Sequence, residues 1–121
     1  MQLPKKKRGD IYSIEMKFPG QSRPIPKLFV LLQDSDWSFV RPLKSISAVK
    51  MTTQYLDRLK PTDVFISANQ TYNNRATKIQ CNFVYTFPIK RLKNFIFHLP
   101  DEIMKKVDRA LIIGLGIIKL D

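Results

Sequence analysis

Cysteine, histidine and acidic residues are scarce in this chain of 121 residues, and each shortage excludes a class of protein. The single cysteine has no partner within the chain for a disulfide framework. One cysteine and one histidine are too few for a zinc cage. No run of about 18 apolar residues exists, so we expect no transmembrane helix. Residues 1–10 lack the apolar stretch of a secretory signal, and we expect a cytoplasmic protein without a cofactor or metal.

Basic residues, by contrast, are abundant. The chain has 21 Lys and Arg against 10 Asp and Glu, a net charge of +11 at pH 7, and no acidic residue from Val64 to Pro100. Such a surplus favours a polyanionic partner, either a nucleic acid or an acidic protein. The alternative is a generally basic surface with no such partner. We expect no membrane partner, because no long basic amphipathic helix is present.

Hydrophobic periodicity predicts a series of short strands and one closing helix. Alternating residues indicate strands over 9–18 and 78–87, and a continuous apolar run indicates a buried strand over 27–33. Shorter strands are expected over 37–43, 62–68 and 94–99. The segment 45–60 lacks strict alternation, and its loosely helical spacing predicts a short helix that ends before Pro61. A single helical turn is expected over 89–93.

The strongest helix prediction covers residues 100–114. Pro100 suits a first helical position, and Asp101 and Glu102 favour the positive end of the helix dipole. Apolar residues recur every four positions at Ile103, Val107 and Leu111. With 44% hydrophobic residues, the chain can form one core. These patterns predict a mainly β fold with α additions, a small, strongly curved antiparallel barrel over residues 9–118, preceded by a basic, mobile N-terminal arm over residues 1–8.

No local motif of phosphate, dinucleotide or zinc binding is present. Cys81 on the apolar face of a strand and His98 before the helix are interpreted as packed residues. Arg23 is of more interest, because it follows a Gly-Gln-Ser loop and precedes Pro24. A fixed guanidinium there could hold a phosphate through two hydrogen bonds. The alternative is a solvated loop arginine.

A set of short segments occurs in the order found in a known family. These segments are Arg8-Gly9-Asp10-Ile11-Tyr12, Arg23-Pro24 with Leu28-Phe29-Val30-Leu31-Leu32, Val40-Arg41-Pro42-Leu43, Lys60-Pro61-Thr62-Asp63-Val64, Arg91-Leu92, and Leu99-Pro100-Asp101-Glu102-Ile103-Met104 continuing through Val107-Asp108 and Ala110-Leu111. Together they resemble the MazF/PemK toxins of bacterial toxin–antitoxin pairs. The resemblance implies an SH3-like barrel, a homodimer, and sequence-selective cleavage of RNA without a metal. It also implies inhibition by an antitoxin whose acidic, flexible tail covers the RNA groove.

The same resemblance suggests which residues act on RNA. It pairs Arg23, as the group that stabilises charge on phosphorus, with Lys44 in a gapless alignment or with Ser45 after a shift of one residue. Ser45 would donate a hydrogen bond to a phosphate oxygen, and Lys44 would supply charge or act as the acid. Further RNA contacts are expected from six residues, namely Lys17, Gln21, Lys27, Arg41, Lys78 and Thr86.

One segment departs from the family pattern. The Glu-Gln-hydrophobic-Arg-Thr segment of the family becomes Asn82-Phe83-Val84-Tyr85-Thr86, in which only Thr86 is retained. Three functional interpretations therefore stay open. The chain is an RNA-cleaving toxin, a non-catalytic relative that binds an antitoxin or nucleic acid, or a toxin that acts on a gyrase-like protein target.

Overall fold

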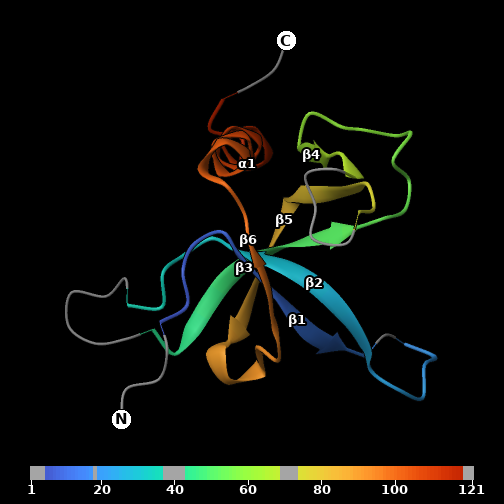
Figure 1. The fold of residues 1–121 in the computed structure, drawn as a ribbon, viewed down its shortest axis with the longest axis vertical. Helices are drawn as coiled ribbons and strands as arrows, with labels where there is room; N and C mark the ends of the chain where they lie inside the picture. Colours follow the sequence, from blue (N-terminus) through green and yellow to red (C-terminus); the bar gives the residue numbers. More distant parts are fainter. Residues whose placement is uncertain (1–4, 18, 37–42, 69–73, 119–121) are drawn as a thin grey trace.

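The computed structural model describes residues 5–17, 19–36, 43–68 and 74–118, in which one antiparallel sheet curls around two apolar clusters and a single helix covers one end (Figure 1). The sheet has the strand order β4-β5-β3-β2-β1-β6. The elements in chain order are β1 (Asp10–Met16), β2 (Ile25–Leu31), β3 (Ser45–Thr52), β4 (Asp63–Ile66), β5 (Thr77–Pro88), η2 (Ile89–Arg91), β6 (Phe95–His98) and α1 (Asp101–Gly114). This arrangement confirms the predicted curved barrel with a C-terminal helix. The third predicted strand, over 37–43, lies largely outside the described residues.

The helix predicted within residues 45–60 is wrong, because residues 45–52 form β3. The buried residues of this strand alternate with exposed or partly exposed ones, but the alternation changes phase in the middle of the strand. Ile46 and Ala48 belong to one apolar cluster, whereas Val49 and Met51 belong to the other. The register shift against β5 between Ala48 and Lys50 places two consecutive buried residues at 48 and 49, so the sequence does not alternate strictly.

The C-terminal helix α1 is confirmed, and its buried face packs against the sheet. Ile103 and Val107 are almost fully buried in the cluster that α1 shares with β4 and β5. The helix ends at Gly114, where the chain passes very close to β5. A Cβ atom at this glycine would lie 2.8 Å from the carbonyl oxygen of Cys81, so only glycine fits without a shift of the backbone. Among the described residues, no helix has the length and apolar character needed to cross a bilayer.

Residues 5–8, the described part of the predicted basic arm, are hydrogen-bonded to the body of the protein. The Lys6 amide donates to Ser35 Oγ over 2.9 Å. The Arg8 amide donates to Asp34 Oδ1 over 2.7 Å, and the Arg8 side chain forms an ion pair with Asp108 on α1. These contacts tie the start of the chain to the β2–β3 connection and to the helix.

Candidate active site

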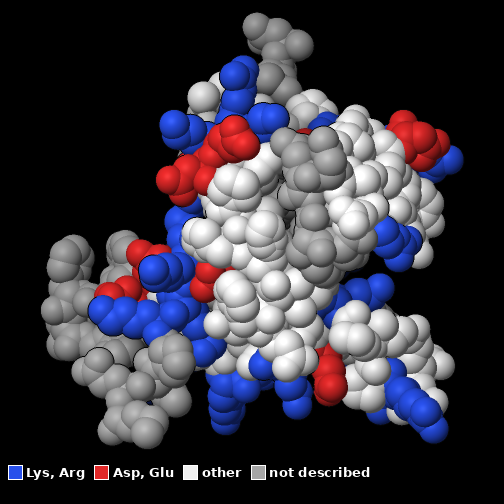
Figure 2. All heavy atoms as spheres, viewed as in Figure 1, with Lys and Arg blue, Asp and Glu red and all other residues white. Residues whose placement is uncertain are grey.

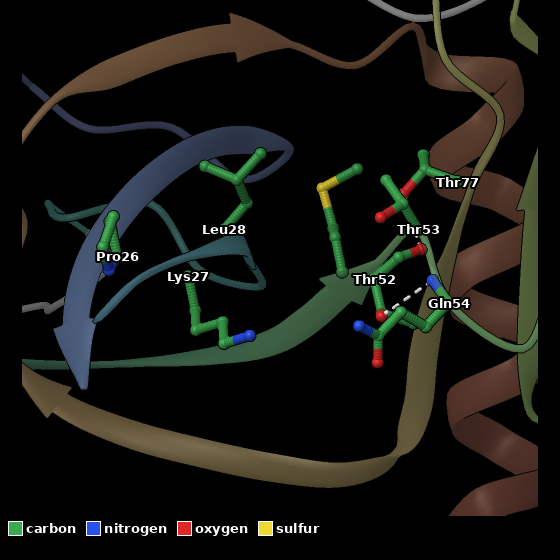
Figure 3. Close-up of a pocket in the computed structure, with 8 residues that line it drawn as sticks. Pro26, Lys27, Leu28, Thr52, Thr53, Gln54 and Thr77 are labelled. Atoms are coloured by element: carbon green, nitrogen blue, oxygen red, sulfur yellow. Dashed lines mark hydrogen bonds between the residues drawn. The ribbon is translucent and has the colours of Figure 1, made fainter. Parts of the chain in front are cut away.

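A pocket opens where β2 and β3 separate. The two strands pair only from Phe29 to Leu31 against Ala48 to Lys50. Earlier residues of β2 pair with β1, and later residues of β3 pair with β5. The resulting gap is a cavity of about 170 Å³, drawn in Figure 3, and is lined by Pro26, Lys27, Leu28, Met51, Thr52, Thr53, Gln54 and Thr77.

Two hydrogen bonds hold the end of β3 in place within this pocket. The Gln54 amide donates to Thr52 Oγ1 over 3.1 Å, the dashed line in Figure 3. The Thr77 hydroxyl donates to the Thr52 carbonyl oxygen over 2.8 Å. Because Thr52 Oγ1 accepts the amide hydrogen, its own hydroxyl hydrogen can point into the pocket. Lys27 extends from β2 toward the β3 side of the same space (Figure 3).

The chemistry of this lining suits an anion. It combines one lysine ammonium with threonine hydroxyls and a glutamine amide, and it contains no carboxylate and no imidazole. Positioned donors of this kind stabilise negative charge that develops on a bound group, and a tetrahedral phosphate offers several acceptor oxygens. Within the described ranges, no group of three or more His, Cys, Asp or Glu side chains is arranged to hold a metal ion.

Lys78 follows the pocket residue Thr77 in β5 and is buried. Its side chain is 4% exposed and forms an ion pair with Asp63 Oδ2 over 3.5 Å. Its ammonium also donates to the carbonyl oxygens of Tyr55, over 2.9 Å, and Arg58, over 3.1 Å. Lys78 is thus held inside the protein, and its contact with RNA stays a prediction. It anchors the β3–β4 connection, which begins with the pocket residues Thr53 and Gln54.

The structure does not bring Arg23 together with Lys44 or Ser45. Arg23 lies in the exposed loop just before β2, and Ser45 pairs with Pro88 at the start of β3. Since β2 and β3 are antiparallel, the start of β2 lies beside the end of β3. Seven residue steps separate Ser45 from Thr52, or about 23 Å at 3.3 Å per residue. Lys44, also exposed, accepts a hydrogen bond from the Ile89 amide through its carbonyl oxygen.

The other predicted RNA contacts are dispersed. Among those that the structure describes, Lys27 alone lines the pocket between β2 and β3. Lys17 and Gln21 are exposed between β1 and β2, and Thr86 is exposed on β5 opposite Ser47. Lys17 lines a separate basic groove together with Glu15, Pro24, Lys90, Arg91 and Lys93. Arg41 lies outside the described residues.

Cys81 and His98 do not take part in the pocket. Cys81 is 1% exposed, and burial raises the pKa of its thiol to about 12, so it is not a ready nucleophile. His98 Nδ1 lies 2.6 Å from Asp10 Oδ1, where β6 pairs with β1. Its ring is 47% exposed rather than fully packed.

Sequence reasoning missed Thr52, Gln54 and Thr77. The expected helix over 45–60 placed Thr52 and Gln54 on a helix rather than at the end of a strand. Their signal was the pair Thr52-Thr53, because β-branched residues favour strands over helices. The contribution of Thr77 depends on the pairing of β5 with β3, which no local pattern reveals.

The fold and this pocket together define a small, curled β-sheet protein with a hydroxyl-lined pocket that carries one lysine. The chain matches the family described as PemK-like, MazF-like toxin of type II toxin–antitoxin system over residues 7–115. The endoribonuclease EndoA of Bacillus subtilis (strain 168) is 32% identical over 117 residues, which span 93% of this chain and 96% of that protein. The chain therefore belongs to the PemK-like, MazF-like toxin family.

Solved structures of other proteins share the fold at low sequence identity. A mycobacterial endoribonuclease in complex with its cognate antitoxin has a TM-score of 0.74 and 17% identity, covering 95% of this chain and 99% of that one. A MazE–MazF structure from Deinococcus radiodurans also has a TM-score of 0.74, with 13% identity, covering 93% of this chain and 97% of that one. These likenesses confirm that the predicted barrel is the fold of this family.

Proposed function

We propose that this protein is a toxin that cleaves single-stranded RNA, with the pocket between β2 and β3 as its active site. The observation that carries the proposal is the convergence of Lys27, Thr52 and Gln54 at the point where the two strands separate. Membership of the toxin family and the similarity to a protein named as an endoribonuclease support it. The basic surface supports an anionic substrate.

The reaction we infer uses the RNA, water and these side chains. A ribose 2′-hydroxyl gives its proton to water, its oxygen attacks the adjacent phosphorus, and the bond to the next 5′ oxygen breaks. That 5′ oxygen takes up a proton from water, so the products are a cyclic phosphate and a free 5′-hydroxyl. Lys27 offsets the charge that develops on phosphorus, while the Thr52 hydroxyl and the side-chain amide of Gln54 donate hydrogen bonds to its oxygens.

Cleavage of RNA by the purified protein in the presence of EDTA tests this proposal. Removing one donor of this kind typically lowers kcat by about 10²- to 10³-fold. We therefore expect Lys27→Met and Thr52→Val to lose at least about 10²-fold in kcat/KM. The matched controls are Lys44→Met and Ser45→Ala, at the other end of β3, which we expect to cleave like the wild type.

The opposite pattern would support the site suggested by the family resemblance. In that case Lys44 or Ser45 variants lose cleavage, and Arg23→Lys loses about 10²-fold or more while RNA binding falls much less. If the wild-type protein binds RNA but never cuts it, the catalytic proposal fails. The protein is then a binding member of the family.

We also infer an acidic antitoxin as a protein partner. Figure 2 shows Lys and Arg side chains around much of the visible outline and Asp and Glu in a few small groups. The net charge of +11 gives an acidic tail a complementary surface. The mycobacterial relative solved with its cognate antitoxin and the MazE–MazF structure support this inference.

The assembly we propose is a homodimer in the cytoplasm, with residues 9–118 as one domain. Three apolar side chains that follow α1 are exposed to solvent in the monomer. The exposed fractions are 63% for Leu115, 70% for Ile117 and 56% for Ile118. An apolar group of this kind is typical of a protein interface. Sedimentation at micromolar concentration tests the proposal, and a monomer alone would contradict it.

A further inference from the structure

A bend in β5 exposes an aromatic residue close to the proposed active site. Lys50 of β3 pairs with Gln80 of β5, but Ala48 pairs with Tyr85. One residue of β3, number 49, therefore lies opposite four residues of β5, numbers 81–84. These extra residues form a bulge in β5, in which Cys81 stays in the core and Val84 is 42% exposed. Phe83, in the same bulge, is 65% exposed.

Phe83 forms one side of a cleft of about 230 Å³, which we call the aromatic cleft. The cleft is lined by Lys50, Lys60, Gln80, Asn82, Phe83 and Tyr85. Its volume is below the ~300–1,000 Å³ of pockets that enclose a drug-sized ligand. The lining has two ammonium groups, two amides, two aromatic rings and no acid. This composition suits a ligand with one planar ring and a negatively charged group attached near the ring.

The second ring of the aromatic cleft is held rigidly. Tyr85 stacks on Phe87, with ring centroids 5.9 Å apart and planes 5° from parallel. It also meets the buried Phe29 edge to face, with centroids 5.3 Å apart. Tyr85 therefore presents a wall that is already ordered before a ligand arrives, which limits the entropy lost on binding.

The aromatic cleft adjoins the proposed active site along β3. Lys50 lines the cleft, and Thr52, two residues later on the same strand, lines the pocket between β2 and β3. Residues two apart on a strand leave the same face, about 7 Å from each other. A single strand of RNA with a phosphate at Thr52 therefore reaches the cleft with a neighbouring nucleotide.

From this arrangement we propose that the aromatic cleft binds one unpaired base of the RNA beside the cleaved phosphate. The base stacks on Phe83 and Tyr85, and Lys50 and Lys60 hold the flanking phosphates. The amides of Gln80 and Asn82 face the edge of the base, where hydrogen bonds select one base over another. The proposal rests on the proposed function, because it takes RNA as the ligand, and it adds residues that set sequence preference.

Binding of uncleavable RNA tests the cleft separately from catalysis. The probes are heptanucleotides with 2′-fluoro riboses, which lack the attacking hydroxyl, and with 2-aminopurine moved along the sequence. We expect the wild-type protein to quench the fluorescence at one position. Since each stacked base contributes about 1–3 kcal/mol, Phe83→Leu should weaken binding by about 5- to 150-fold and remove that quench. Phe83→Trp should retain both.

Two matched variants complete the experiment. Phe95→Leu makes the same change at another exposed phenylalanine, on β6, which is 55% exposed, and should leave binding unchanged. Lys50→Gln should reduce the slope of log affinity against log salt concentration by about 0.7, the value for one phosphate contact to a single strand. An unchanged slope overturns the role of Lys50.

Three results would overturn the proposal that the aromatic cleft binds a base. The first is equal binding and equal quenching by the wild type and Phe83→Leu. The second is no binding of any probe by the wild type. The third is a change in sedimentation of Phe83→Leu from dimer to monomer, which would assign Phe83 to a protein contact. If the wild type binds the probes through Phe83 but never cuts RNA, the proposed cleavage function is refuted. The proposal that the aromatic cleft binds a base is then retained.

Discussion

The buried Lys78–Asp63 pair offers a sharp test of how the pocket is supported. Both side chains are almost fully buried, at 4% and 3% exposure. The Lys78 ammonium also satisfies two backbone carbonyls of the β3–β4 connection. Lys78→Met keeps the length of the side chain but removes all these donors. It leaves the Asp63 carboxylate buried beside an apolar group.

The expected loss of stability is large. Breaking a buried ion pair by removing one partner costs about 3–5 kcal/mol, because the remaining charge stays desolvated. For a chain of 121 residues, an unfolding entropy of about 2.1 cal/mol/K per residue makes 1 kcal/mol equivalent to roughly 4 °C in Tm. We therefore expect Lys78→Met to lower Tm by about 12–20 °C. The exposed Lys93→Met should change stability by no more than about 0.5 kcal/mol.

Urea unfolding at one fixed protein concentration measures the difference, since association alters apparent stability. The connection held by Lys78 contains the exposed Arg58, which is a trypsin site, whereas Lys60 precedes Pro61 and is not cut. Trypsin should cut there faster in Lys78→Met than in Lys93→Met under native conditions. A loss below about 1 kcal/mol, with unchanged proteolysis, would refute the conclusion that Lys78 anchors this segment.

Three further expectations follow from single contacts. Gly114→Ala should destabilise the fold by about 1–3 kcal/mol, measured by urea unfolding, because its Cβ would lie 2.8 Å from the Cys81 carbonyl oxygen; an unchanged or higher midpoint would contradict the close packing. Burial raises the pKa of the Cys81 thiol from 9.0 to about 12, so between these pH values the folded protein retains a proton that the unfolded chain loses. Stability due to this group is present below pH 9 and falls by about 1.4 kcal/mol per pH unit as pH rises toward 12; Cys81→Ala should lack this slope, and equal slopes would refute it. Thr77→Val should lower stability by about 1 kcal/mol and reduce RNA cleavage, because it removes the hydrogen bond to Thr52; full cleavage activity would show that Thr77 does not position Thr52.

Local patterns in the chain were sufficient for much of the fold. Alternation over 9–18 and 78–87 predicted β1 and β5, and the spacing of Ile103 and Val107 predicted α1. The helical spacing was reliable because α1 buries one face, with Ile103, Met104, Val107 and Ala110. In β1 and β5 the apolar pattern located the strands but not their buried positions, since Ile11 and Ile14 enter different clusters and Phe83 is exposed. The net charge of +11 likewise predicted an anionic partner without any structure.

Only the pairing of distant strands decided where the pocket lies and which residues line it. Thr52 and Lys27 come together because β2 and β3 stop pairing beyond Phe29 and Lys50. Lys78 faces inward because it lies between two strands and beneath a connection, although its residue type suggested a surface contact. Strand register and the burial of individual side chains depend on contacts between residues far apart in sequence. A charged or hydroxyl side chain therefore becomes a ligand contact or an internal support only when the sheet has closed around it.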